Sequence, residues 1–216
     1  DDLTISLDTS GELMHVRQDR DFRGHGSIRE NIACALLIKL LGLKPIENIT
    51  LIDPMCGTGT FLFEAQNFHK LTKRDFLFNQ WNINLKQDIS LITINPPWSF
   101  KQIIGYDIDS NIINMNKKIA SSIRFEPRDI FDEKRDSIDN EPQSSKQFII
   151  CNPPYGKRVK IEGNKEIFFK NIVSQSFYSR GRCQSGFIIP TPFENKLKGS
   201  KLYFSQNGIS VCFLTH

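Results

Sequence analysis

The chain has 216 residues, a net charge of +4 and 39% hydrophobic residues, which suits a single globular domain with a sizeable core. No apolar run approaches the roughly 18 residues of a membrane-spanning helix. Its five cysteines include no C-x-x-C pair, and no signal peptide begins the sequence, so we expect a reducing cytoplasmic location, no metal site and no membrane partner.

The first elements are a short hairpin and a helix. Residues Ile5 to Val16 alternate as a hairpin that turns at Ser10-Gly11. Ser27 and Glu30 form the pattern of a capping box for a helix from Ile28 to Leu41, which Gly42 ends. We therefore predict an N-terminal hairpin or extension over residues 1–25 and one main domain over 26–216.

A glycine-containing turn follows the first apolar strand. The strand Ile49 to Ile52 leads into Asp53-Pro54-Met55-Cys56-Gly57-Thr58-Gly59-Thr60, and Phe61 to Ala65 then has the character of a helix. Ligands of doubly wound sheets bind beside such turns, where glycine lets the backbone approach them closely. The spacing is not G-x-G-x-x-G and no Lys follows, which disfavours nicotinamide and nucleoside triphosphate ligands. A tight strand-to-helix turn without a ligand is the simpler alternative.

Two further strands end in acids. Ile103 to Asp109 is a strand that carries Asp107, a carboxylate placed to accept both hydroxyl groups of a ribose. Residues Ile123 to Phe125 form a third strand, followed by Asp129. Each acid alone is weak evidence, because strands often end in Asp, but their order along the chain is informative.

The fourth strand, Phe148 to Cys151, ends in Asn152-Pro153-Pro154-Tyr155. The lone pair of an amino group on a planar ring is delocalised and therefore a poor nucleophile. The Asn152 carboxamide oxygen and the Pro153 carbonyl can accept its two N–H groups and direct the lone pair at an electrophile, while proline keeps that carbonyl rigid. Tyr155 offers a flat face for a flipped base. Asn-Pro dipeptides also form ordinary turns.

A second segment, Asn95-Pro96-Pro97-Trp98, has the same local chemistry. It precedes the strand with Asp107, so in a sheet of this kind it does not end the strand next to the first one. We interpret it as a turn. Cys56 and Cys151 flank the proposed site, and we interpret both as small buried residues rather than nucleophiles.

The remaining sequence completes the sheet. Residues 133–147 are predicted to form a surface loop, and Lys165 to Tyr178 an amphipathic helix. A fifth strand covers Gly186 to Ile189. The last hairpin joins Leu202–Phe204 to Ile209–Leu214 across Asn207-Gly208. In the helix Lys165 to Tyr178, the residues predicted to face the core are Ile167, Phe168, Ile172 and Phe177.

Positive charge is concentrated behind the Asn-Pro-Pro-Tyr motif. From Gly156 to Lys201 ten Lys or Arg residues face three acids, a net charge of +7 in that stretch. A phosphate backbone would pass there, so the excess favours nucleic acid over an ordinary solvated face.

Together these motifs resemble the class I S-adenosylmethionine-dependent methyltransferases, and more closely the guanine-N2 methyltransferases of large-subunit ribosomal RNA that carry a THUMP domain. The similarity covers nearly the whole chain. It rests on four segments: Asp8 to Gly11, Ser27 to Asn31, Asp53 to Thr60, and Asn152 to Arg158. The resemblance implies an α/β fold, a Rossmann-like seven-stranded sheet with helices on both faces and an antiparallel last strand pair.

The resemblance also assigns roles. S-adenosylmethionine would be the cofactor, with Asp107 at its ribose and Asp129 at its adenine amino group. Asn152 and Pro153 would hold the target amine and Tyr155 would stack on the base, which would belong to 23S-type ribosomal RNA. The residues expected around the methionine part of the cofactor are Asp53, Cys56, Gly57, Thr58 and Gly59.

One departure concerns the THUMP domain, for which the roughly 25 residues before the first helix leave no room. We expect either a THUMP-bearing partner or a missing N-terminal domain. Two alternatives remain open: an N6-adenine methyltransferase of DNA or RNA, which uses the same four residues, and an inactive or accessory paralogue.

Overall fold

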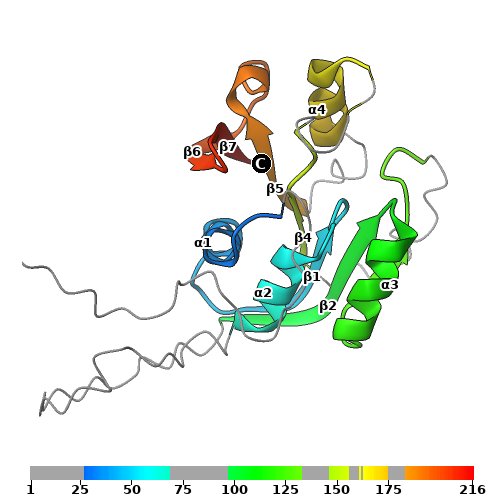
Figure 1. Cartoon of the computed structure of the whole chain (residues 1–216). Helices are drawn as coiled ribbons and strands as arrows, with labels where there is room; N and C mark the ends of the chain where they lie inside the picture. Colours follow the sequence, from blue (N-terminus) through cyan, green and yellow to red (C-terminus); the bar gives the residue numbers. More distant parts are fainter. Residues whose placement is uncertain (1–26, 69–96, 133–145, 156–160, 162, 175–182) are drawn as a thin grey trace, which may run out of the picture.

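The computed structural model describes residues 27–68, 97–132, 146–155, 161, 163–174 and 183–216. Strands and helices alternate along most of this chain (Figure 1). The elements are α1 (Glu30–Leu41), β1 (Ile46–Asp53), α2 (Thr60–Gln66), β2 (Trp98–Asp107), α3 (Ser110–Ile119), β3 (Arg124–Pro127), β4 (Lys146–Cys151), α4 (Lys165–Ser174), β5 (Cys183–Pro190), the 3-10 helix η4 (Thr191–Phe193), β6 (Ser200–Gln206) and β7 (Ile209–Thr215).

The strands form one seven-stranded sheet in the order β3-β2-β1-β4-β5-β7-β6. Strands β1 to β5 pair in parallel, whereas β7 lies antiparallel between β5 and β6. This arrangement confirms the predicted fold class and the antiparallel last pair. The turn between β6 and β7 is also confirmed, because Asn207 and Gly208 both have the positive φ that a two-residue hairpin turn requires.

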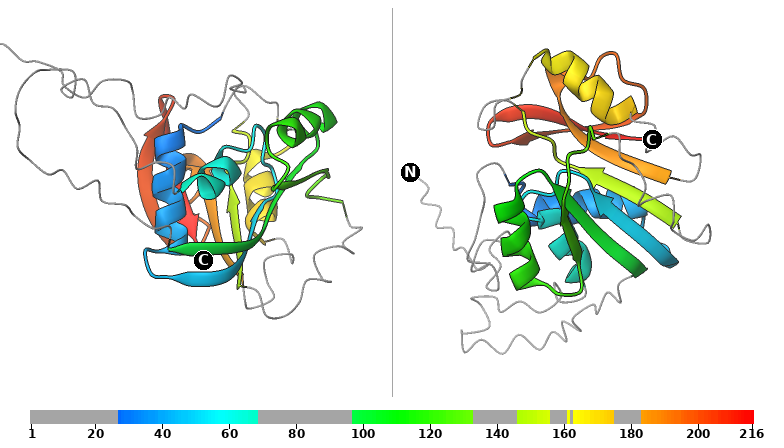
Figure 2. Two further views of the ribbon diagram at one scale, coloured as in Figure 1. Left: turned by 90° about the horizontal axis from the view of Figure 1, so that it is seen from below. Right: turned by 90° about the vertical axis from the view of Figure 1, so that its right-hand side faces the viewer.

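Two apolar clusters hold helices against opposite faces of the sheet, as the alternation of strand side chains dictates. Leu51 of β1 packs in one cluster with side chains of α1, α2 and α3, and Ile52 packs in the other with Phe169 and Ile172 of α4. Figure 2 shows α4 on the side of the sheet away from α1 and α2. Among the helices that the structure describes, none has the length and apolar character needed to cross a membrane.

Several predicted boundaries are wrong. Helix α1 begins at Glu30 with Arg29 as its N-cap, so the capping box does not start it at Ile28; Glu30 instead lies in the first turn, where the helix dipole favours a carboxylate. Strand β2 begins five residues before Ile103. Residues 146–147, predicted as loop, open β4, where they pair with β1 and β5.

The predicted core of α4 is partly wrong. Ile167 is 56% exposed, and Phe169 takes its place in the core beside Ile172. Phe168 is half-buried against the same cluster, whereas Phe177 lies outside the described residues, as do the predicted hairpin Ile5 to Val16 and residues 133–145 of the predicted loop.

Candidate active site

The predicted site residues of three strands meet at one edge of the sheet. Asp53 ends β1, Asp107 ends β2 and Asn152 directly follows β4. The registers are level, since Ile52 of β1 pairs with Ile104 of β2 on one side and Ile149 of β4 on the other. Because β1 lies between its two parallel partners, the glycine turn after β1 is flanked by both other strand ends (Figure 1).

The peptide groups of Gly57 are held from two sides. Its N–H donates to Oδ2 of Asp107 over 2.8 Å, and its carbonyl accepts a hydrogen bond of 2.7 Å from Nδ2 of Asn116. Asn116 lies on α3 and is 1% exposed. Sequence analysis missed this residue, although its spacing of three from the buried Ile113 was a signal that it faces the sheet.

Both glycines of the turn have a left-handed backbone, with φ of 49° at Gly57 and 71° at Gly59. A Cβ on Gly59 would lie 2.9 Å from the Phe63 ring, whereas a Cβ on Gly57 would meet no atom within 4 Å. Gly59 is therefore required by packing, and the open side of Gly57 leaves space for a ligand. Cys56 and Thr58 beside them are buried.

Asp53 is a buried carboxylate, 2% exposed. Burial raises its pKa well above the ordinary value; the N–H of Met55, which donates to Oδ1 over 3.2 Å, opposes the shift, and the charge of Asp107 adds to it. A cationic group bound beside Asp53 would stabilise the ionised form. The carboxylate is thus suited to the ammonium or sulfonium of a bound molecule.

Asp107 is half-buried and accepts one backbone hydrogen bond on each oxygen, from Gly57 on Oδ2 and from Asp109 on Oδ1 over 3.0 Å. A carboxylate oxygen can accept two, so both retain capacity for hydroxyl groups. The next side chain, Ile108, is 74% exposed and forms an apolar surface there. Asp109 is occupied as the N-cap of α3, where it accepts from Asn111 and Ile112.

Asp129 lies farther along the same edge. The N–H of Arg128 donates to the Asp107 carbonyl over 2.8 Å, which joins this segment to the end of β2. Asp129 is exposed, and its Oδ1 accepts the N–H of Phe131 over 2.9 Å. The structure therefore brings Asp53, Asp107 and Asp129 to neighbouring positions along the carboxyl ends of β1, β2 and β3.

The Asn-Pro-Pro-Tyr segment leaves β4 without regular structure. Pro153 is buried and Asn152 half-buried. The Tyr155 hydroxyl donates to Oδ1 of Asn152 and lies 3.1 Å from Oε1 of Gln206 on β6. Burial raises the pKa of Tyr155, so the hydroxyl keeps its proton at neutral pH. Stacking of the Tyr155 ring on a base stays a prediction.

The neighbouring thiols have little nucleophilic character. Cys56 and Cys151 are both buried and free, and burial raises the pKa of each, with the charge of Asp53 adding to the effect. The thiolate is the nucleophilic form, so these shifts agree with their interpretation as small buried residues. Within the described residues no group of three or more His, Cys, Asp or Glu side chains could hold a metal ion.

The second Asn-Pro-Pro segment leads to the amino-terminal ends of β1 and β2, opposite to the ends that carry Asp53 and Asp107. Asn95 and Pro96 lie outside the described residues, but Trp98 opens β2 and pairs with Ile46 at the start of β1. Its indole N–H donates to the Gly42 carbonyl over 2.8 Å. At about 3.3 Å per residue, a straight strand would place Trp98 up to roughly 30 Å from Asp107. Trp98 thus lies at the opposite ends of the strands from the proposed site, and the turn at Asn95 and Pro96 stays a prediction.

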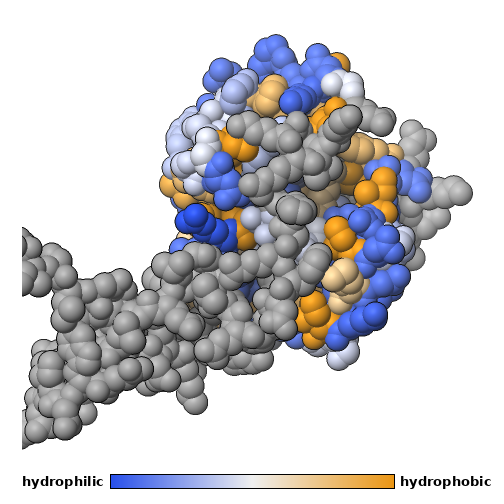
Figure 3. Space-filling view, in the orientation of Figure 1, coloured by the Kyte–Doolittle hydropathy of each residue, from blue (hydrophilic) through white to orange (hydrophobic). Residues whose placement is uncertain are grey.

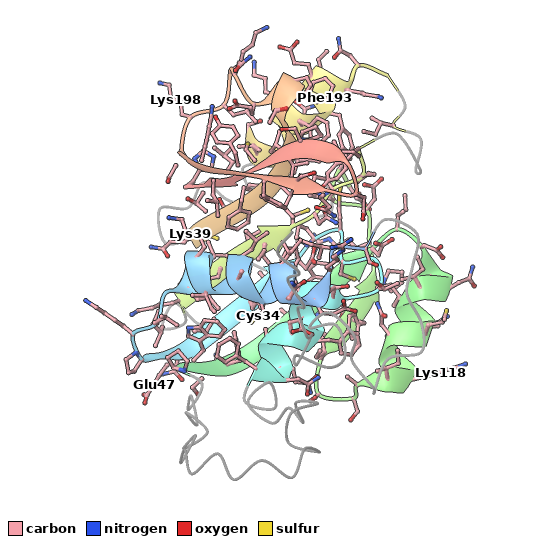
Figure 4. The ribbon with its side chains drawn as sticks, turned by 60° about the vertical axis from the view of Figure 1, so that its left-hand side comes forward. Cys34, Lys39, Glu47, Lys118, Phe193 and Lys198 are labelled. Atoms are coloured by element: carbon pink, nitrogen blue, oxygen red, sulfur yellow. The ribbon has the colours of Figure 1, made fainter. Side chains whose placement is uncertain are left out.

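The described part of the basic stretch is only partly available to a ligand. Lys196 pairs with Glu166 at 2.6 Å, and Lys201 pairs with Glu194. Hydrophilic residues cover the end of the molecule around α4 (Figure 3). Lys39, Lys118 and Lys198 lie far apart in Figure 4, so these cations do not gather into one patch.

Comparisons with known proteins show the family of the chain. The family model described as RMKL-like, methyltransferase domain, matches residues 17–196. The large-subunit ribosomal RNA methyltransferase K/L of Buchnera aphidicola is 35% identical over 97% of the chain, and that of Shewanella frigidimarina 31% over 73%. The chain spans only 32% and 24% of the lengths of these two relatives.

Among solved structures, SMU.472, which was crystallised in complex with SAH, superposes with a TM-score of 0.68 and 24% identity. The match covers 96% of this chain and 56% of that one. The similarity extends over the whole described sheet and supports the same fold.

Proposed function

Because the chain belongs to the RMKL-like methyltransferase domain family, we propose that it transfers a methyl group from S-adenosylmethionine to an exocyclic amine of an RNA base. The family membership confirms the resemblance inferred from the motifs. One observation carries the proposal: the glycine turn held by Asp107 and the Asn152 to Tyr155 segment follow adjacent, level strands.

The residues of the first two strand ends fit S-adenosylmethionine. Gly57 leaves space beside the turn, Asp107 has acceptor capacity for two ribose hydroxyls, and Asp53 is a buried carboxyl group whose ionised form a cationic methionine moiety would stabilise. Asp129 would accept from the adenine amino group, with Ile108 against the ring. When bound, the cofactor supplies a methyl group already activated by its sulfonium. The residues around the methionine moiety would be Asp53, Cys56, Gly57, Thr58 and Gly59.

The residues after β4 would prepare the amine. The Asn152 Oδ1 and the Pro153 carbonyl would each accept one N–H, which directs the nitrogen lone pair at the methyl carbon and shares the positive charge that develops. The bound cofactor would supply the methyl group in a single displacement, in which its carbon–sulfur bond would break as the nitrogen–carbon bond formed. The proton then leaves the nitrogen for water, so no general base is required.

The proposed substrate is guanine N2 of large-subunit, 23S-type ribosomal RNA. The relatives named large-subunit ribosomal RNA methyltransferase K/L support the RNA substrate. The choice of guanine N2 rests on the Asp53 to Thr60 and Asn152 to Arg158 segments, which resemble the guanine-N2 enzymes. A THUMP-bearing partner or domain would supply the principal RNA contacts. N6-adenine methylation and a non-catalytic role are the alternatives that the experiment must separate.

The test is methylation of ribosomal RNA in vitro, followed by identification of the nucleoside by mass spectrometry. We expect N2-methylguanosine. Asn152→Ala should abolish transfer while cofactor affinity is retained, because Asn152 acts on the amine. Asn95→Ala is the matched control and should retain activity. N6-methyladenosine as the only product would overturn the choice of guanine. The absence of any methylated product would favour the accessory role. Loss of activity in Asn95→Ala but not in Asn152→Ala would overturn the assignment of the site to Asn152.

A further inference from the structure

We propose that Gln206 is a positioning residue, which acts through the Tyr155 hydroxyl to hold Asn152 with its carboxamide oxygen toward the target amine. The inference rests on the proposed function and adds to it a residue from β6, the outermost strand on one side of the sheet. Gln206 ends β6 and is 3% exposed.

The topology brings Gln206 to the side of the sheet where β4 and β5 have their carboxyl ends, which is also where Asn152 lies. Strand β5 runs parallel to β4 and ends at Pro190, which pairs with Val211 of β7; Val211 in turn pairs with Phe204 of β6. The hairpin turn at Asn207-Gly208 therefore lies beyond the carboxyl end of β5. A residue 51 positions from Tyr155 in sequence thus comes within hydrogen-bonding distance of it.

The donors and acceptors define how the three side chains are connected. Tyr155 has one hydroxyl proton, yet two carbonyl-type oxygens face it, on Asn152 and on Gln206. At the same time Nε2 of Gln206 is buried and has no hydrogen-bond partner among the described residues. Both conflicts have one solution. Turning the Gln206 carboxamide by 180° lets its N–H donate to the Tyr155 oxygen and leaves the Tyr155 proton for Asn152.

This direction of donation has a consequence for the amine. A hydroxyl that donates toward Asn152 must meet an oxygen, so the orientation with Oδ1 toward Tyr155 is favoured over the one with the amide nitrogen there. In the proposed complex, a second lone pair of the same oxygen would accept an N–H of the target amine. A reversed Asn152 would present donors to a donor. Gln206 therefore stabilises the productive orientation without touching the substrate.

The experiment is a double-variant cycle measured as the single-turnover methylation rate at saturating cofactor and RNA. Gln206→Met and Tyr155→Phe should each slow transfer about tenfold, the size of one neutral hydrogen bond in a rate. The double variant should be no slower than Tyr155→Phe, because Gln206 acts only through that hydroxyl. Affinities for cofactor and RNA should not change. Ser205→Ala is the control, an exposed neighbour on the opposite face of β6.

A second readout does not require activity. The side-chain amide protons of Gln206, followed by NMR, should shift on Tyr155→Phe and be protected from exchange in the wild type. If the rate losses of the two single variants multiplied in the double variant, Gln206 would not act through Tyr155 and the proposed relay from Gln206 through Tyr155 to Asn152 would be overturned. A weakened RNA affinity with an unchanged rate constant would overturn it too, because it would indicate that Gln206 contacts the substrate directly. A wild type that methylates no RNA would remove the proposed function and, with it, the positioning role of Gln206. An unaffected amide signal in an active enzyme would remove the relay alone.

Discussion

Asp107 connects the two strand ends that form the proposed cofactor site, since it accepts from Gly57 of the turn while it ends β2. We expect S-adenosylhomocysteine to raise the melting temperature of the wild type, because a ligand at 100 times its Kd stabilises by about 2.7 kcal/mol. Asp107→Ala should lose most of this rise. Thermal unfolding with and without ligand measures the difference.

The matched control is Asp109→Ala, two residues away, which removes the N-cap of α3. This variant should lose about 1 kcal/mol of stability, which lowers its melting temperature without ligand. It should retain the rise in melting temperature that S-adenosylhomocysteine causes. Stabilisation of the protein by NAD but not by S-adenosylhomocysteine would contradict the cofactor assignment.

Asp53 predicts a pH dependence. Its folded-state pKa is raised by burial, so from about pH 4, the unfolded value, up to the folded pKa the native state holds a proton that the unfolded chain has lost. The contribution of Asp53 to stability without ligand therefore falls as pH rises through this window and does not change further above it. Asp53→Asn should remove this fall and increase stability at neutral pH.

A cationic cofactor should lower the same pKa, so its binding releases protons within that window and strengthens as pH rises. Calorimetric titration in buffers of different ionisation enthalpy would detect the release. Asp53→Asn should bind more weakly and release no protons; equal proton release from both proteins would assign the release to a group other than Asp53.

At the scale of the elements, α3 supports the glycine turn through one buried side chain. Asn116→Leu fills a similar volume but leaves the Gly57 carbonyl without its 2.7 Å donor, which should cost about 1–3 kcal/mol of stability. Cofactor affinity should fall as well, because the turn loses its fixed position. Denaturant unfolding and cofactor titration check both effects.

Asn114→Leu is exposed on the same helix and should leave both values close to those of the wild type. If Asn116→Leu destabilised the protein but bound the cofactor normally, Asn116 would serve folding alone.

The strand ends were predictable from the sequence, whereas the contacts between them were not. Apolar runs bounded by Asp53, Asp107 and Asn152 predicted β1, β2 and β4, because a buried parallel strand must be apolar until it reaches the edge. The hydrogen bonds of Asn116 and Gln206 join residues 59 and 51 positions apart, and no local pattern encodes them. The exposure of Ile167 was missed for the same reason: helical spacing offered two apolar stripes, and the sheet contacts only one.

For the whole molecule, charge predicts how RNA binds. Of the cations in the described part of the basic stretch, Lys196 and Lys201 are paired with acids, and Lys198 lies apart from Lys39 and Lys118 in Figure 4. Non-specific nucleic-acid binding has a Kd of about 10⁻⁴ to 10⁻⁶ M at physiological salt. We expect this chain alone to bind RNA in that weak range, with affinity that falls steeply as salt rises.

Filter binding across a salt series would measure the slope, and methylation of naked ribosomal RNA should be slow. Tight binding that salt does not weaken would indicate specific base contacts, contrary to this expectation.

The position of β7 has a consequence for how the protein is made. Because β7 inserts between β5 and β6, the sheet cannot be completed until residues through Thr215 have emerged from the ribosome. Strands β1 to β5 can pair earlier, but until then the outer edge of β5 is open and Val211 to Leu214 are missing from both apolar clusters. Gln206 reaches Tyr155 only after the same step. A nascent chain that has already formed the cofactor side of the site would therefore still lack the support of its amine side, so the ability to bind the methyl donor should precede the ability to use it.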